Sequence, residues 1–387
     1  MSAHKEDSWI QEICRKWSGN LPLSTGGFAE SAGPGWTEGP ETERTMLTQA
    51  RLAYTFTHAG ILGGGDGDLA RTGREAGVRM MDLYWNPGLR GWIRSCDKEG
   101  RPLDETVDTY DQAFGLLALA WSYKAPGDSA ARAAAVLALK GLEKSSGDSS
   151  FGGFRELRNG SRASRMVAYP GFRRQNPHMH LLEAFLAWHS ADPSGPWLDR
   201  ARAMVELFRT HFRHPSSGNL SEYFNDEWKL AKGAAGKVRE PGHQHEWVWL
   251  LRRYEETSGD ASVRQDAEHL YRFALTRGTD LDRLAFAEID DDGNIPDMRK
   301  LLWPQTETLK AHIAMYEWTG NASAKESAVK VFEAIRKRFM TGDGALFFNL
   351  LDKDGKPDPA PALSRLLYHL FVAAAEAERV FEPLSDS

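Results

Sequence analysis

Aromatic residues in short alternating runs recur along this chain at a nearly constant interval. With Trp92, Phe154, Tyr223, Phe286 and Phe347 as markers, the successive separations are 62, 69, 63 and 61 residues. Several of these runs lead directly into an Asp/Gly turn, which is typical of a small β-hairpin. A period of this length accommodates one helical hairpin plus one β-hairpin. The constant spacing therefore predicts a repeat architecture.

Helical periodicity fills the intervals between the markers. The predicted helices cover residues 7–18, 41–62, 66–85, 106–124, 128–144, 177–190, 196–212, 242–258, 260–277, 303–319, 321–339 and 359–381. They fall into six pairs, which could form an open solenoid or a closed ring. Closure is favoured because neither end carries a polar capping repeat. We therefore expect an all-α fold, an (α/α)6 barrel with short β-hairpin loops at one mouth, as a single domain over residues 1–387.

Composition excludes several classes of function. The net charge of −6 is spread along the chain, which argues against nucleic acid as a partner. No apolar run reaches the ~18 residues that a membrane span requires. Cys14 and Cys96 are too few for a disulfide framework, and residues 1–7 lack the apolar core of a signal peptide. These features predict a cytoplasmic protein, and both a monomer and a homodimer fit them.

Tryptophan is abundant, with 13 residues in the chain of 387. Packing between many helices explains most of them. The flat apolar faces of indole rings also stack on the C–H faces of sugars, so composition alone leaves sugar binding open. The glycine-rich run at residues 63–67 lacks the Lys and Ser/Thr of a phosphate loop. It therefore predicts a turn between helices and no nucleotide cofactor.

Two short runs place a histidine three residues before a glutamate at the start of a predicted helix. His180 and Glu183 form the first pair, and His243 and Glu246 form the second, after a Pro-Gly step. Residues at this spacing share one helix face. A histidine beside a carboxylate transfers protons near neutral pH. His180 has a second interpretation, in which it caps the first turn of its helix.

Each run also contains a His-x-His sequence, which suggests a metal pair. His178 and His180 are two positions apart, as are His243 and His245, which is about 200° around a helix. Both rings of such a pair can face one site only on an extended backbone. The helical phase therefore predicts no metal site.

Three further features complete the candidate set. His369 lies on the last predicted helix, which in a closed ring lies beside the first and can face the same cavity. Arg51 is a cation on an otherwise apolar helix face, so it needs a salt bridge, an anion or an oxyanion as partner. Trp303, Gln305 and Glu307 open another predicted helix, where an indole, an amide and a carboxylate suit sugar contacts.

Taken together, these runs resemble the N-acylglucosamine 2-epimerase superfamily, which includes cellobiose 2-epimerases and mannose isomerases. The resemblance spans about residues 40 to 375. It is carried by Asn176-Pro-His-Met-His180-Leu-Leu-Glu183, Gly242-His243-Gln-His-Glu246-Trp, Trp303-Pro-Gln305 and Tyr368-His369. The residues from Lys237 to His243 look closest to the mannose isomerase branch. Leu363-Ser364-Arg365 stands where some epimerases carry a tryptophan, which argues mildly against a disaccharide epimerase.

The resemblance implies an (α/α)6 barrel and histidine catalysis without a metal or nucleotide cofactor. The expected reaction interconverts D-mannose and D-fructose through a cis-enediol. His243, tuned by Glu246, would move the proton between C2 and C1, and His369 would assist ring opening. Arg51 and His180 would stabilise the enediolate. The residues expected to contact the monosaccharide are Arg51, His180, Asn176, Glu183, Trp303 and Gln305.

Several alternatives stay open at this point. The protein could be a 2-epimerase of mannose, N-acylglucosamine or cellobiose. It could be a sulfoquinovose isomerase that recognises an acidic group through basic residues near the mouth, although a solvated rim is their commoner role. Those basic residues are Arg173, Arg174, Lys237 and Arg239. From other classes, a glycoside hydrolase would use Glu222 with Asp111 or Glu246. A sugar-binding toroid without catalysis and a metal-dependent isomerase complete the alternatives.

Overall fold

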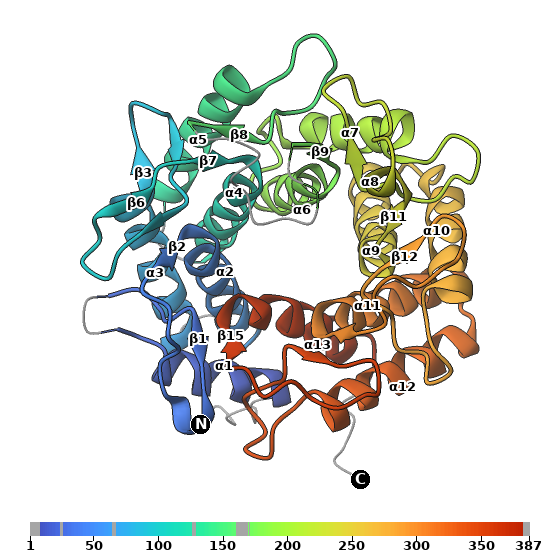
Figure 1. Ribbon diagram of the computed structural model, residues 1–387. Coiled ribbons are helices and arrows are strands. Elements are labelled where there is room, and N and C mark those ends of the chain that lie inside the picture. The colour runs from blue at the N-terminus through green and yellow to red at the C-terminus, as the bar shows by residue number, and fades with distance from the viewer. Residues whose placement is uncertain are drawn as a thin grey trace.

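The computed structural model describes residues 8–23, 26–63, 67–125, 129–159, 169 and 171–381. Residues 1–7 and most of the glycine-rich run lie outside these ranges, so the expectations for them stay predictions. The described chain forms two concentric rings of helices, seen down their common axis in Figure 1. None of the helices within the described ranges is long and apolar enough to cross a membrane.

Each repeat contributes one helix to the inner ring and one to the outer ring. The inner helices are α2 (Met46–Leu62), α4 (Thr109–Lys124), α6 (Asn176–Ala191), α9 (Pro241–Ser258), α11 (Leu302–Thr319) and α13 (Leu367–Val380). The outer helices are α1 (Trp9–Asn20), α3 (Asp68–Tyr84), α5 (Ala130–Ser146), α7 (Trp197–Leu207), α10 (Val263–Arg277) and α12 (Ala322–Arg338). The predicted (α/α)6 barrel is confirmed.

The burial pattern explains which helices lie inside. Residues 304–315 of α11 are all buried, as expected for a helix with neighbours on every side. In α12 the buried side chains are spaced three or four residues apart, which leaves one face to water. They are Ala324, Ala328, Val331, Phe332 and Ile335. The inner ring is therefore covered by the outer ring along its length.

Three helices begin later than predicted, because a short strand lies among their expected first residues; before α4 it is β7 (Val107–Asp108). Residues 44–45 form β2 (Arg44–Thr45), and α2 starts only after it. Before α13, Pro359 and Pro361 disfavour helix in the residues preceding them, and β15 (Ala362–Leu363) and the turn η4 (Ser364–Leu366) follow. The smaller elements α8 (Ala234–Lys237), η1 (Pro34–Trp36) and η3 (Phe208–Phe212) were not predicted as separate elements.

Short strands link each repeat to the next. A two-residue strand lies just before every inner helix, namely β2, β7 (Val107–Asp108), β9 (Arg173–Arg174), β11 (Val238–Arg239), β13 (Lys300–Leu301) and β15. Their antiparallel partners, in the same order, are β5 (Ser95–Cys96), β8 (Leu157–Arg158), β10 (Tyr223–Phe224), β12 (Ile289–Asp290), β14 (Leu350–Leu351) and β1 (Ser31–Ala32). Because β15 near the C-terminus pairs with β1 near the N-terminus, this ladder closes the ring.

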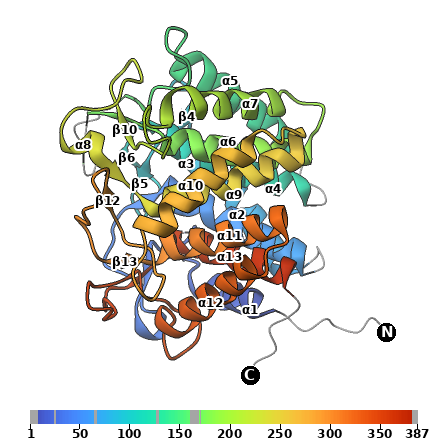
Figure 2. The same cartoon turned by 90° about the vertical axis from the view of Figure 1, so that its right-hand side faces the viewer.

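The predicted β-hairpins are also present. The turn at residues 97–100 joins β5 to β6 (Pro102–Asp104), and β3 (Trp85–Asn86) pairs with β4 (Gly91–Trp92). Bridges between Glu288 and Asp297 and between Leu351 and Pro357 close two of the later hairpins. The strands lie at one end of the rings, on the left of Figure 2. The sequence predicted the hairpins but not the pairing between repeats.

A side-chain amide repeated at the start of the inner helices fixes these loops. In each of four repeats a glutamine Oε1 accepts the backbone N–H, and its Nε2 donates to the C=O, of one loop residue. The pairs are Gln49 with Phe28, Gln112 with Trp92, Gln244 with Leu220 and Gln305 with Ala285. Gln305 therefore satisfies buried backbone groups, which argues against the sugar contact expected for it.

Candidate active site

Ring closure brings most of the predicted site residues to the strand-bearing end of the inner ring. Arg51, His180, His243, Glu246 and His369 come from four different inner helices, and all are buried. Trp303, at the start of α11, is half-buried and lies between two of the histidines. Its ring centroid is 4.9 Å from that of His243 and 5.9 Å from that of His369. Residues far apart in sequence thus form one site.

Gly242 explains how α9 can approach Trp303 so closely. A Cβ atom at this position would lie 2.4 Å from the indole ring, which no side chain could tolerate. The Pro-Gly step that begins α9 therefore positions the indole beside His243. This agrees with the expectation that the step lets the chain approach the mouth.

His243 is held by carboxylates. Its Nδ1 lies 2.9 Å from Oε2 of Glu222 and 3.4 Å from Glu240, and its Nε2 lies 3.2 Å from the Asn176 amide. Burial opposes a charge here, but Glu240 and Glu222 outweigh it and raise the pKa of His243 to about 10. His243 is therefore an imidazolium at neutral pH. The predicted partner Glu246 acts on it only at longer range, so Glu222 and Glu240 take that role.

His369 has the opposite electrostatic environment. Its Nδ1 lies 2.8 Å from Oε1 of Glu307, whose Oε2 lies 2.6 Å from Nζ of Lys310. Burial, followed by the positive charges of Arg51 and Lys310, lowers the pKa of His369 well below its ordinary value. The ring is therefore neutral and donates Nδ1–H to Glu307. Its Nε2 makes no hydrogen bond with a described residue and carries a lone pair.

His180 is paired with Glu183 as predicted. Its proton, however, lies on Nδ1 towards Glu183, and the predicted stabilisation of an enediolate oxygen would require a proton on Nε2. Its Nδ1 lies 3.2 Å from Glu183, which also accepts the hydroxyl of Tyr368 at 2.5 Å. Burial lowers the pKa of His180 to about 4, so the ring is neutral and donates from Nδ1. Its Nε2 is then an acceptor, which suits a sugar hydroxyl. The expected stabilisation of a negative oxygen by His180 is not supported by this arrangement.

Arg51 supplies the positive charge that an oxyanion would need. Its Nη2 donates to the Tyr110 hydroxyl at 2.7 Å and its Nη1 to the Arg365 carbonyl at 3.3 Å. The guanidinium lies 4.2 Å from the ring centroid of Phe114 and 4.9 Å from that of Tyr368. Within the described residues no carboxylate pairs with it. An unneutralised, desolvated guanidinium favours a negatively charged ligand or transition state.

Glu246 lies beneath the site as a buried carboxyl group. Its Oε1 is 3.9 Å from Nε2 of His180 and makes no hydrogen bond to any residue that the structure describes. Burial, followed by repulsion from Glu307, raises the pKa of Glu246 well above its ordinary value. It therefore holds a proton at neutral pH. As a neutral acid it can donate a hydrogen bond to His180 or to substrate.

Among the described residues, two sets of side chains are close enough to hold a cation, with donor atoms within 4.8 Å of one another. They are Glu222, Glu240 and His243, and Glu246, Glu307 and His369. In the second set Lys310 already supplies a positive charge at Glu307. The expected independence of a metal stays a prediction.

The other members of the two His-x-His runs point away from the site. His178 accepts the backbone N–H of Phe154 at 2.9 Å, and His245 lies 2.9 Å from the hydroxyl of Thr308. Burial lowers the pKa of both rings to about 3. The helical-phase argument that separated these histidines from His180 and His243 is confirmed.

The four basic residues considered for an acidic substrate are engaged elsewhere. Each forms an ion pair with a nearby carboxylate: Arg173 with Asp148, Arg174 with Glu156, Lys237 with Asp292, and Arg239 with Asp291. The side chains of Arg173 and Arg239 are only 2% and 0% exposed, so a solvated rim is wrong for these two. Both arginines hold loops in place.

Several residues of the site were missed from the sequence, or were given another role. Glu222, Glu240 and Lys310 were not proposed as partners of the histidines, and Glu307 was considered only as a sugar contact. Glu240 precedes His243 by three residues, as Glu307 precedes Lys310. These spacings were available signals. The pairs Glu222–His243 and Glu307–His369, in contrast, depend on how the repeats meet.

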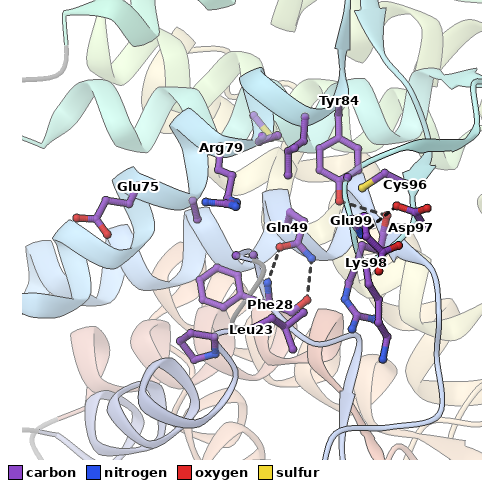
Figure 3. Close-up of a pocket in the computed structure, with 18 of the residues that line it drawn as sticks. Leu23, Phe28, Gln49, Glu75, Arg79, Tyr84, Cys96, Asp97, Lys98 and Glu99 are labelled. Atoms are coloured by element: carbon purple, nitrogen blue, oxygen red, sulfur yellow. Dashed lines mark hydrogen bonds between the residues drawn. The ribbon is translucent and has the colours of Figure 1, made fainter.

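Two of the hollows of the described structure show where space lies apart from the site histidines His180, His243 and His369. One, of about 330 Å³, is on the outside between α3 and the β5–β6 hairpin, and Figure 3 shows Gln49, Arg79, Tyr84 and Lys98 on its wall. Another, of about 370 Å³, lies among the C-terminal parts of the inner helices and reaches Glu183. The first contains none of the predicted site residues, and the second touches the site only at Glu183.

Comparison with known proteins identifies the family of this chain. The model of the N-acylglucosamine 2-epimerase (GlcNAc 2-epimerase) family matches residues 31–373. A mannose-6-phosphate isomerase of Rhizobium meliloti (strain 1021) is 32% identical over 372 residues, 91% of this chain and 90% of that protein. A cellobiose 2-epimerase of Ruminococcus albus is 24% identical over 343 residues, 83% of this chain and 82% of that protein. A crystal structure of a D-mannose isomerase has a TM-score of 0.83 at 18% identity, covering 98% of this chain and 100% of that one. The chain belongs to the N-acylglucosamine 2-epimerase family.

Proposed function

We propose that this protein is an aldose–ketose isomerase that interconverts D-mannose and D-fructose by histidine acid–base catalysis. The family and the named relatives support a sugar isomerase or epimerase. The observation that carries the proposal is the pair of histidines beside Trp303, one charged and one neutral. The indole of Trp303 lies between a proton donor and a proton acceptor. This arrangement suits a bound sugar whose carbonyl group must move between C1 and C2 by proton transfer.

Ring opening comes first. The ring oxygen gains a proton and the O1 hydroxyl loses one. His243 can donate the first proton and accept the second. The open aldose then has a carbonyl at C1, which acidifies the C–H bond at C2. His369, through its free Nε2, removes that proton to give a cis-enediolate, and His243 then donates a proton to O1 and takes one from O2. Return of the proton to C1 yields the ketose and restores His369.

The negative oxygen that develops during proton removal needs a positive group. Arg51 provides it, because its guanidinium has no carboxylate partner within the described residues. Loss of one such donor typically costs about 10²–10³-fold in rate. His180 accepts a hydroxyl of the sugar, and Asn176 contributes an amide beside His243.

This division of labour reverses the one inferred from the sequence, in which His243 was the base. The reversal follows from charge. A histidine with a pKa of about 10 holds its proton at neutral pH, whereas one with a pKa well below 6.5 is free to accept a proton. The proposal therefore assigns the base to His369 and the acid to His243.

A 2-epimerase is the second candidate, because the same pair of a charged and a neutral histidine could also serve it. If the enediolate formed by His369 receives the proton of His243 at C2 from the opposite face, the product is the epimer. Mannose would then give glucose. The position of the bound sugar relative to Trp303 decides between the two outcomes.

Incubation with D-mannose in D₂O, with EDTA present, tests the proposal. Fructose as the product, with deuterium entering C1 to the extent that His369 exchanges with solvent, supports the isomerase. Glucose labelled at C2 establishes the epimerase instead. Turnover that survives EDTA supports the expected independence of a metal.

The remaining alternatives give different results in the same experiment. A glycoside hydrolase leaves the free sugar unchanged and releases reducing sugar from a glycoside. A sugar-binding protein binds mannose and does not convert it. Failure to convert mannose, fructose or glucose would sink both candidate functions.

A further inference from the structure

Lys310 is a charged side chain in an unusual place. It is fully buried in α11, with Nζ 2.6 Å from the carboxylate of Glu307 and 4.0 Å from the ring centroid of Trp249. Burying an ammonium group is costly unless it is paired, and this pair has no exposure on either side. Neither the family resemblance stated above nor the proposed mechanism gives this lysine a role.

Lys310 acts on a carboxylate that is itself bound to a histidine. Glu307 uses one oxygen for Lys310 and the other for Nδ1 of His369. Burial raises the pKa of Glu307, and the ammonium of Lys310 opposes that rise. The lysine therefore favours the ionised form of Glu307, which accepts Nδ1–H and leaves the lone pair of His369 on Nε2.

The surroundings of His369 show where its neutrality comes from. The charged and titratable groups around the ring come from four inner helices: Arg51 of α2, His180 and Glu183 of α6, Glu246 of α9, and Glu307 and Lys310 of α11. Among these, Arg51 and Lys310 are the cations. Arg51 faces the substrate in the proposed mechanism, whereas Lys310 reaches His369 through Glu307.

We propose that Lys310 is a positioning residue, which holds Glu307 as a carboxylate and so keeps His369 oriented and free to accept a proton. This inference rests on the proposed function, because it concerns the histidine that removes the proton from C2. Lys310 does not touch the sugar. Its influence is on the charge and tautomer of the base.

Removal of the ammonium has two consequences, and both have the same sign. If Glu307 stays ionised, His369 loses a nearby cation and binds a proton more readily. If Glu307 becomes protonated, it can no longer accept Nδ1–H and His369 loses its orientation. In either case activity requires a higher pH than in the native protein. The acid limb of the pH–rate profile therefore moves to higher pH.

The test is the pH dependence of kcat/KM for mannose in K310M, K310Q and K310R. We expect the acid limb of the two neutral variants to lie at least one pH unit higher, so that kcat/KM at pH values below the native limb falls at least 10-fold, on the scale of charge effects between close groups. K310R keeps the charge and should restore much of the native limb. A matched control is K124M, because Lys124 also lies over an indole, 4.2 Å from the Trp121 ring centroid, and does not contact Glu307.

A double substitution shows whether Lys310 acts through Glu307. If it does, K310M adds little to the loss already caused by E307Q, because the two side chains act as a unit. If the losses in kcat/KM caused by the two single substitutions multiply in the double variant, Lys310 does not act through Glu307. Circular dichroism and thermal unfolding check that each variant folds, and K310Q replaces K310M if the latter does not.

Two results would overturn the proposal: a folded neutral variant with native kcat/KM and an unmoved acid limb, or a native protein in which His369 titrates near pH 6.5. The second measurement, by NMR of the histidine rings, needs no substitution at Lys310. Failure of the proposed function is distinct, because the native protein itself would then convert none of the sugars.

Discussion

The two histidines beside Trp303 share one design, and their charges differ. His243 and His369 each present Nδ1 to a glutamate at a short distance, 2.9 Å to Glu222 and 2.8 Å to Glu307. The pKa of His243 is raised to about 10, whereas the pKa of His369 is lowered well below its ordinary value. A histidine–carboxylate pair alone therefore does not determine which proton-transfer role the histidine takes.

Burial lowers the pKa of both rings, and near His369 the charge of Arg51 adds to this effect. Each pair also has a third charge beside it, and these two charges act in opposite directions on the two rings. A second carboxylate, Glu240, lies 3.4 Å from His243, whereas Lys310 lies 2.6 Å from the carboxylate that holds His369. An added anion favours the imidazolium, and an added cation favours the neutral ring. Neighbouring charges can thus turn two similar pairs into an acid and a base, which is the arrangement that proton transfer across a sugar requires.

Replacement of either histidine by asparagine should have the largest effect. Each substitution removes one proton-transfer group, and we expect kcat to fall by about 10³-fold, within the usual range for general acid–base catalysis. H58Q is a control, because His58 stacks on Trp121 in the hollow among the C-terminal parts of the inner helices, away from the strand-bearing end. Near-native turnover in H243N or H369N would remove that residue from the mechanism.

Neutralising the two carboxylates should have unequal effects. E307Q removes the only carboxylate that we find bonded to His369 among the described residues, and we expect a loss of roughly 10²-fold. E222Q leaves Glu240 beside His243, so the loss should stay below about 10-fold. The measurement is kcat/KM at pH 7 with folding checked for both variants. Equal losses would show that the third charge is not what separates the pairs.

E240Q should shift the pH profile and leave the activity at pH 7 nearly unchanged. His243 acts as an acid while it is protonated, so activity falls as pH rises through its pKa. Without the charge of Glu240 this pKa drops, and the alkaline limb of kcat/KM should move down by about one unit. The acid limb, which belongs to the His369 side, should not move. A shift of the acid limb instead would reverse the assignment.

The stability of the fold should also depend on pH through its buried histidines. His245 has a folded-state pKa of about 3, below its unfolded value, so the unfolded chain binds more protons as pH falls from about 6.5. The free energy of unfolding should therefore decrease between about pH 6.5 and 4, and less steeply in H245Q. His243 has a raised pKa, so its contribution is full below about 6.5 and disappears as pH rises towards 10. Urea unfolding at several pH values measures both slopes, and identical slopes in H245Q and the native protein would contradict this account.

The ring could be predicted from the sequence because its signals are local. The regular spacing of markers such as Phe154 and Phe347 and the apolar periodicity of the helices require no knowledge of distant contacts. The strand pairings between repeats could not be predicted in this way. Ile289 pairs with Arg239, and Leu363 with Ser31, and nothing in either short segment specifies such a partner.

The same distinction holds in the site. His180 and Glu183, three residues apart on one helix, are bonded as their spacing predicts. His243 and Glu246 have that spacing too, yet the histidine bonds to Glu222 and the glutamate faces His180. Helix geometry brings two side chains within reach of each other. The neighbouring repeats determine which partner each one takes.

The most direct test of the central claim is an NMR titration of the two imidazole rings in the native protein. Histidines labelled with ¹⁵N and assigned through H243N and H369N report the protonation of each ring as the pH is changed. We expect His243 to stay protonated up to about pH 9 and His369 to stay neutral down to below pH 6.5. Two rings that titrate together near pH 6.5 would show that the site holds no preset acid and base.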